Sequence, residues 1–285
     1  MKKLSVGLCL FATTLFAAGG RDDAVRERMS LRSRAMAEIA PTAISQSKAT
    51  TWIFIPAAAS SAGGFGTFYR SDVMIANYRS VPQVVRARWI PAGGDGFSTS
   101  TVKVTVPANS AVSYSDFVSS VLHQSGLGTI ELVARDASDT IDLDAKIDAF
   151  SRIWTPQPNS TAGSVSQDFA GLYIFQIEGT DPAHAIGLRQ DDKFRTNVGI
   201  VNLDFFDAHT WRIDVIGTRG TTSMNITVPS FSMIQTNIPG GNWGDVAITF
   251  TPDSAMSFEN WMAYAASSDS GTNDGWVSIA TQIGK

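Results

Sequence analysis

Two short stretches of the chain carry paired polar side chains of the kind that bind polar ligands. Arg70 and Asp72 stand two residues apart. Arg195 and Asn197 repeat this spacing about 125 residues later. Residues two apart on a strand share a face, so each pair would present a guanidinium beside an oxygen acceptor. The alternative is a hydrogen-bonding pair on the surface or between domains, because exposed ion pairs are common and contribute only about 0–1 kcal/mol.

These pairs belong to an internal repeat. Residues 69–77 align with residues 194–202 without a gap, Val73 on Val198, Ile75 on Ile200 and Asn77 on Asn202. Repetition at a fixed spacing indicates repeated architecture, and we expect two equivalent strands with the polar pair facing outward. The residues expected to face the core are Tyr69, Ser71, Val73, Ile75 and Asn77, with Phe194, Thr196, Val198, Ile200 and Asn202 as their counterparts.

An acidic cluster, Asp139, Asp142, Asp144 and Asp148, is a candidate for a metal site, and residues 269–275 form a similar oxygen-rich loop that is more simply a β-turn. Calcium requires several oxygen ligands held in one place. On the strand that we expect over residues 141–150, Asp142 and Asp144 share a face but stand about 6–7 Å apart. No glycine-containing calcium loop surrounds them. The sequence therefore predicts no cofactor, and calcium at this cluster is the one alternative left open.

The sequence offers few side chains suited to acid–base catalysis. The chain has three histidines, His123, His184 and His209, and lacks a Gly-x-Ser-x-Gly elbow, a His-Glu-x-x-His pair and a P-loop. We predict that the protein is not an enzyme and name no catalytic residue. A hydrolase is the minority alternative, and it requires a cleft that joins His184 or His209 to a carboxylate and a nucleophile.

Seven tryptophans offer a second kind of binding surface, because aromatic rings stack on sugars. Trp89, Trp211 and Trp261 lie in alternating segments, where a core position is expected. The other four, near strand ends or turns, are better candidates for exposure: Trp52, Trp154, Trp243 and Trp276. We take Trp52 and Trp243 as ligand-binding candidates beside the two polar pairs, with packing at the core or its rim as the alternative.

Composition places the chain among exported β-proteins. Of its 285 residues 17% are charged, below the average of about 25%, and the net charge of −4 argues against a nucleic-acid partner. Residues 1–20 read as a signal peptide, with Lys2 and Lys3 before an apolar segment too short to span a bilayer. The only cysteine, Cys9, lies inside that peptide. We predict a secreted, periplasmic or cell-surface protein without a transmembrane segment in the mature chain.

Alternating strands and turns dominate the rest of the sequence. Residues 21–49 read as a linker, disordered or partly helical, and a strand at residues 52–55 precedes an Ala/Ser/Gly-rich loop at 57–66. Segments 83–90 and 101–106 alternate cleanly. Residues 115–123 are the best helix candidate.

The second half follows the same order. Residues 172–177 are expected to match the strand at 52–55, and a loop at 178–193 precedes the second copy of the repeated strand. Loops on a rigid β-sandwich commonly carry binding residues, so the two loops that lead into the repeated strands are where we expect function.

We predict an all-β fold of two tandem Ig-like antiparallel β-sandwich domains, residues 50–158 and 159–285. Short strands with turns every 8–12 residues are typical of sandwiches. The Pro/Ser/Thr-rich segment 156–166 favours two domains over one large barrel or sandwich.

The segments IPAAAS, GTFYRSDVMIANY and VRARWIP, with WMAYAASSDSGTNDGWVSIATQ near the C-terminus, resemble Ig-like repeat modules of secreted proteins from soil and environmental bacteria. The resemblance covers most of residues 50–285 and its motifs are structural. It implies a binding or scaffolding role in the envelope or outside the cell.

Together these patterns predict a secreted, non-catalytic protein with an adhesive, structural or interaction role. Its expected partner is a protein or polysaccharide of the envelope or extracellular matrix. A carbohydrate-binding accessory module is the main alternative, and it requires exposed, coplanar aromatic side chains.

Overall fold

The computed structural model describes residues 21–30, 51–157, 162–254 and 260–283. The chain divides into two compact units, residues 1–47 and 48–285. In the first unit, residues 21–30 are helical. The predicted signal peptide and the predicted domain boundary at residues 158 and 159 lie outside the described residues.

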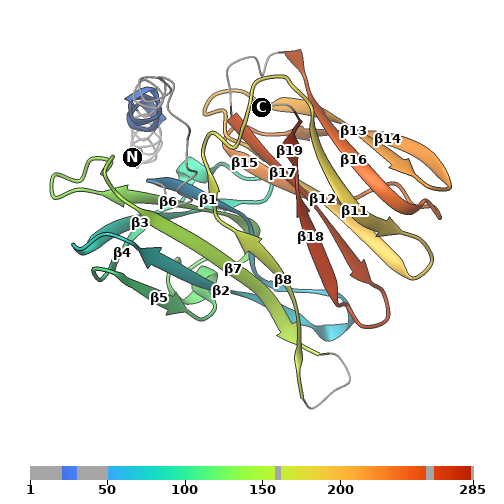
Figure 1. The fold of residues 1–285 in the computed structure, drawn as a ribbon, viewed down its shortest axis with the longest axis horizontal. Coiled ribbons are helices and arrows are strands. Elements are labelled where there is room, and N and C mark those ends of the chain that lie inside the picture. Colours follow the sequence, from blue (N-terminus) through green and yellow to red (C-terminus); the bar gives the residue numbers. More distant parts are fainter. Residues whose placement is uncertain (1–20, 31–50, 158–161, 255–259, 284–285) are drawn as a thin grey trace, which may run out of the picture. The chain divides into compact units, whose positions relative to one another are not determined.

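The first repeat forms one hydrogen-bonded sheet, in which β4, β3, β6, β1, β2, β7 and β8 lie in this order, with β5 on β2 and β9 on β1 (Figure 1). Its strands are β1 (Trp52–Ala62), β2 (Phe68–Asn77), β3 (Gln83–Pro91), β4 (Thr101–Val106), β5 (Ser110–Tyr114), β6 (Gly126–Arg135), β7 (Ile147–Pro156), β8 (Ser164–Ala170) and β9 (Leu172–Tyr173). Only the last residues of β1 pair with β2, so β1 passes from one part of the sheet to the other.

The second repeat has two separate sheets, one with the order β14, β13, β16, β11, β19 and one with the order β10, β17, β12, β15, to which β18 adds on β17. Its strands are β10 (Ile177–Glu178), β11 (Ala183–Gln190), β12 (Phe194–Asn202), β13 (His209–Gly217), β14 (Gly220–Val228), β15 (Ser232–Asn237), β16 (Gly244–Pro252), β17 (Asn260–Asp269), β18 (Gly275–Ile279) and β19 (Thr281–Gln282). The all-β prediction is confirmed.

The two repeats correspond strand by strand, β1 to β11 and onward to β9 and β19. In both, the first strand pairs with the sixth across an irregularity in register, between Ile55 and Ala58 in one and between Ala185 and Leu188 in the other. A two-residue last strand then pairs with the first strand in each repeat. The immunoglobulin arrangement places the third, sixth and seventh strands in one sheet, whereas here β7 pairs with β2 and β17 with β12.

Both predicted loops that lead into the repeated strands are in large part strand. β1 continues through residues 57–62, and β11 takes up half of residues 178–193. The counterpart of the strand at residues 52–55 is therefore β11 rather than residues 172–177. Ala57, Ala58 and Ala59 are at most 5% exposed, and small side chains of this kind suit closely packed strands as well as they suit loops.

Two other expectations were wrong in extent. The predicted helix at residues 115–123 is a single turn, α2 (Phe117–Ser120), preceded by Asp116 in the left-handed conformation. The strand expected from residue 141 begins at Ile147, and residues 143–144 form a turn. Asp142 accepts the backbone N–H of Asp144 and forms an ion pair with Arg79.

A buried asparagine ends each of the two equivalent strands. Nδ2 of Asn77 donates to the carbonyls of Val81, Val106 and Pro107, and its Oδ1 accepts from the N–H of Arg79. Asn202 makes the same four bonds, to Asp207, Val228, Pro229 and Asp204. These amides anchor the turn that follows, a place that suits asparagine without any ligand.

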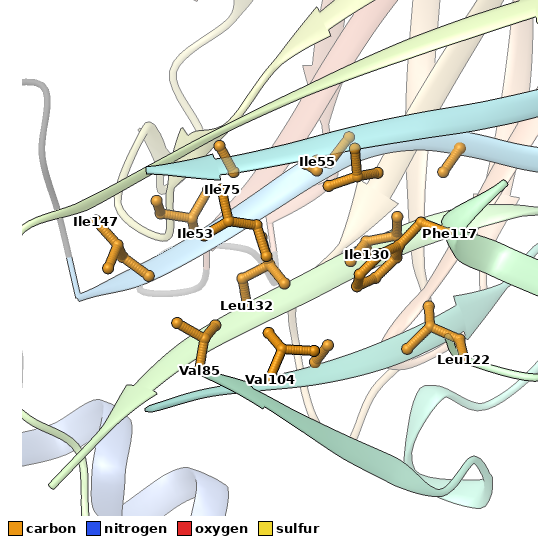
Figure 2. Close-up of a cluster of buried hydrophobic side chains, with 14 of the residues drawn as sticks. Ile53, Ile55, Ile75, Val85, Val104, Phe117, Leu122, Ile130, Leu132 and Ile147 are labelled. Atoms are coloured by element: carbon orange, nitrogen blue, oxygen red, sulfur yellow. The ribbon is translucent and has the colours of Figure 1, made fainter. Parts of the chain in front are cut away.

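Each repeat has its own hydrophobic core. In the first, Figure 2 shows inward side chains of β1, β2, β3, β4, β6 and β7, among them Ile55, Ile75 and Ile130, meeting Phe117 of α2. In the second, Trp211 and Trp261 pack together at a centroid distance of 5.8 Å. The inward set predicted for the repeated strands is confirmed at Val73, Ile75, Val198 and Ile200, among others.

Aromatic contacts join the two repeats within the unit 48–285. Phe97, between β3 and β4, stacks on Phe231 at 4.3 Å and lies edge-on to Phe205 at 5.3 Å. Gly96 donates its N–H to the Phe231 carbonyl. Tyr264 of β17 contacts Phe169 of β8 edge-to-face at 5.1 Å and belongs to the core of the first repeat.

Candidate binding faces on the repeated strands

The two candidate pairs lie at equivalent places on the outward side of β2 and β12. Arg70 is opposite Trp154 and Asp72 is opposite Arg152. In the second repeat, Arg195 is opposite Ser268 and Asn197 is opposite Ala266. The sequence therefore located equivalent positions correctly, but the surroundings of the two pairs differ.

In the first repeat the pair is part of the structural hydrogen-bond network. Asp72 accepts the backbone N–H of Asp116 at 3.0 Å and the indole Nε1 of Trp154 at 2.8 Å. Arg70 lies 4.8 Å from the centre of the Phe68 ring, and its Nε is 3.9 Å from Asp116 Oδ2. Both oxygens of Asp72 are thus occupied, and Arg70 has a carboxylate beside it.

This side of the first repeat is open to solvent. We call it the outer face and define it by Arg70, Asp72, Met74, Phe150, Arg152 and Trp154. Met74 is 46% exposed and Phe150, directly opposite, is 37% exposed. The guanidinium of Arg152 lies 5.9 Å from the Trp154 ring. Apolar and charged side chains thus alternate across a sheet surface.

The same side of the second repeat is covered. By strand register, Gly199 and Tyr264 stand where the first repeat has Met74 and Phe150. Tyr264 is fully buried against the first repeat, and a Cβ on Gly199 would lie 2.1 Å from its ring. Burial raises the pKa of Tyr264, which keeps its hydroxyl a donor to Gln235 Oε1 at 2.6 Å.

A cavity of about 270 Å³ remains between the two repeats, and it contains the second candidate pair. Arg195 donates from Nη2 to Oδ1 of Asn273 at 2.7 Å. One wall is polar, with Asn197, Gln235 and Ser268 beside Arg195, and the other includes Tyr69, Leu127, Ile153 and Phe169. Strand pairing thus brings Arg195 and Asn197 to a concave site, which Arg70 and Asp72 do not line.

The two tryptophan candidates do not form a ligand platform. Trp52 is fully buried, and its Nε1 donates to Glu131 Oε1 at 3.0 Å. Trp243 is half-buried, donates to the Pro239 carbonyl and packs over Gly241. The expectation of exposure was wrong for Trp52 because both sides of β1 are covered. Three tryptophans were expected in the core, and all three are buried there: Trp89, Trp211 and Trp261.

One of the three histidines, His209, lies in a buried contact with two carboxylates. His209 is 3% exposed and bonds through Nε2 to Asp204 at 2.9 Å and through Nδ1 to Asp253 at 3.1 Å. Burial opposes protonation, but the two carboxylates outweigh it and raise the pKa of His209. His184 instead bonds Thr249. Within the described ranges, no group of three or more His, Cys, Asp or Glu side chains could hold a metal ion.

Several residues of the cavity were missed at the sequence level. Gln235, Ser268 and Asn273 come from β15, β17 and the turn after β17, and only the register with β12 places them beside Arg195. The match between residues 69–77 and 194–202 indicated β12, but nothing in the sequence indicated that the first repeat would cover it.

No protein-family model matches this chain, and no curated protein matches it. Among solved structures, "Crystal Structure of Thermotoga maritima 1070" aligns with this chain at 8% identity and a TM-score of 0.31, over 37% of this chain and 97% of that one. A similarity of this size carries no argument about fold or function. None of the helices described is long and apolar enough to cross a membrane.

Proposed function

We propose that this is a secreted, non-catalytic interaction protein, built from two tandem β-sandwich-like repeats, that adheres to an envelope or extracellular protein through its outer face. The observation that carries the proposal is the contrast between equivalent faces. The second repeat buries this side against protein, whereas the first leaves Met74 and Phe150 exposed.

The composition of the outer face fits a protein partner. Aromatic residues, methionine and arginine are enriched in protein interfaces, and the outer face combines Met74, Phe150 and Trp154 with Arg70 and Arg152. Trp154 is held in place by its bond to Asp72, and Arg152 by a bond to Ser164. Ordered side chains of this kind lose little conformational entropy on binding.

A binding experiment with two matched variants tests this function. Purified protein is titrated against envelope fractions of the source organism, before and after protease digestion of the fraction, and against polysaccharides. We expect protease-sensitive binding that Met74→Lys and Phe150→Lys each weaken at least tenfold. Ile216→Lys, at a 57% exposed position on β13, is the control and should leave binding unchanged.

Two outcomes would overturn the proposal. Binding that Ile216→Lys weakens as much as Met74→Lys would show that the outer face is not the contact. Binding that survives protease and is reproduced by a polysaccharide would favour the carbohydrate-binding alternative, for which Phe150 and half-buried Trp154 are the aromatic residues on this face.

A further inference from the structure

The cavity between the repeats has a chemical character distinct from that of the outer face. We propose that it binds a small carboxylate that also carries hydroxyl groups, the chemical class of the sugar acids. The site is formed by β12, β15 and β17 of the second repeat and by β1, β2, β6, β7 and β8 of the first. It is independent of the adhesive role proposed above.

The positive charge of Arg195 in the cavity favours a ligand with a carboxylate. Arg195 is the one charged side chain among the described residues that line the cavity, and these include no Asp or Glu. Its Nη2 donates to the neutral amide of Asn273, and it forms no ion pair with any described carboxylate. A planar guanidinium matches a carboxylate with two parallel hydrogen bonds. A single positive charge suits one carboxylate better than a phosphate with nearly two negative charges.

The neutral polar side chains of the cavity favour a ligand that also carries hydroxyl groups. Gln235 accepts from Tyr264 through Oε1, and Asn273 accepts from Arg195 through Oδ1. Their NH₂ groups are therefore the parts left to donate, since an amide carries one acceptor and two donors. Asn197 and Ser166 add an amide and a hydroxyl to the lining. Such donors pair with the remaining ligand oxygens.

Size and the opposite wall limit the ligand to one ring. The volume of about 270 Å³ is near the lower end of ligand pockets, about 300–1,000 Å³. Tyr69, Leu127, Ile153 and Phe169 give this wall apolar surface, which the C–H face of a sugar ring would cover. The site thus suits a monosaccharide acid better than a long chain.

The first repeat supplies the matched control. Arg70 occupies the position of Arg195, but it lies outside the cavity lining and has Asp116 at 3.9 Å and Phe68 at 4.8 Å. Removing the Arg70 charge therefore changes the same strand position in the other repeat without touching the proposed site.

Isothermal titration with glucuronate, galacturonate and glucose tests the inference. We expect saturable binding of at least one uronate, at least tenfold tighter than glucose. Arg195→Met should weaken it at least tenfold, whereas Arg70→Met and the outer-face variant Met74→Lys should stay within twofold of the parent protein. Ser166→Phe places a large side chain from β8 in the cavity and should abolish binding. It is the second test of the site if Arg195→Met lowers the melting temperature.

The inference is overturned if neither uronate binds, if glucose binds as tightly, or if Arg195→Met and a folded Ser166→Phe both bind like the parent protein. Loss of uronate binding in Arg70→Met equal to that in Arg195→Met would also contradict it. Because envelope binding is measured separately with Met74→Lys, failure here leaves the adhesive role unaffected.

Discussion

A buried ion pair beneath the contact between the repeats gives the sharpest stability prediction. Arg88 Nε lies 3.1 Å from Glu131 Oε2, and the two side chains are 9% and 2% exposed. Trp52 donates to the other oxygen of Glu131, and the Arg88 guanidinium lies 4.9 Å from the ring centre of Phe97, which packs on Phe231. Glu131→Gln keeps the shape and an acceptor for Trp52 but removes the charge that Arg88 faces.

The expected cost follows from leaving a buried charge without its partner. Breaking such a pair destabilises by about 3–5 kcal/mol, whereas replacing both partners with apolar residues is often neutral. We therefore expect Glu131→Gln to lower the free energy of unfolding by about 3–5 kcal/mol. The double variant Arg88→Met, Glu131→Gln, which removes both charges and keeps the acceptor for Trp52, should cost less. The exposed pair of Arg212 and Asp214, at 2.9 Å, provides the control, and Asp214→Asn should cost only about 0–1 kcal/mol.

Urea unfolding followed by tryptophan fluorescence measures these differences, with the slope against urea checked for constancy. Unfolding of Glu131→Gln at the same urea concentration as Asp214→Asn would refute the predicted cost of the unpaired charge. A double variant less stable than Glu131→Gln would also refute it, because the loss of stability would then not come from the unpaired buried charge of Arg88.

Two further predictions concern the repeat and pH. Asn77 and Asn202 are buried, and Asn77→Ala and Asn202→Ala each remove an equivalent set of four hydrogen bonds. Each variant should therefore lower the free energy of unfolding by at least about 1–3 kcal/mol. A cost confined to one of them would contradict their equivalence. The pKa of His209 is raised in the folded protein, so the protonated imidazole stabilises the fold. This stabilisation is complete below the pKa of the unfolded chain, about 6.5, and is lost as the pH rises through the pKa of the folded protein. The parent protein should therefore exceed His209→Gln in free energy of unfolding by more at pH 5.5 than at pH 8.5. A difference that stays constant with pH would show that the fold does not favour the protonated imidazole.

Much of the fold was readable from local patterns. Alternation predicted β3 and β4, and the match between residues 69–77 and 194–202 predicted which side of β2 and β12 faces the core. Asn77 and Asn202 were placed correctly because an asparagine at a strand end has a local reason to be there.

The errors came from interactions between distant segments. The Ala-rich part of β1 has the composition of a loop, and only close packing on both sides makes it a strand. In β11, Gly187 has φ +76° within the irregular pairing to β16, which interrupts the alternation that marks a strand. The cavity depends on the first repeat covering β12, which no local pattern encodes.

The central claim is that the outer face of the first repeat is the contact surface. Hydroxyl-radical footprinting, with and without a saturating amount of the bound envelope fraction, tests it most directly. We predict that Met74 and Phe150 are reactive in the free protein and protected in the complex, whereas Ile186, 70% exposed on β11, keeps its reactivity. Unchanged reactivity of Met74 and Phe150 at saturation would contradict the claim.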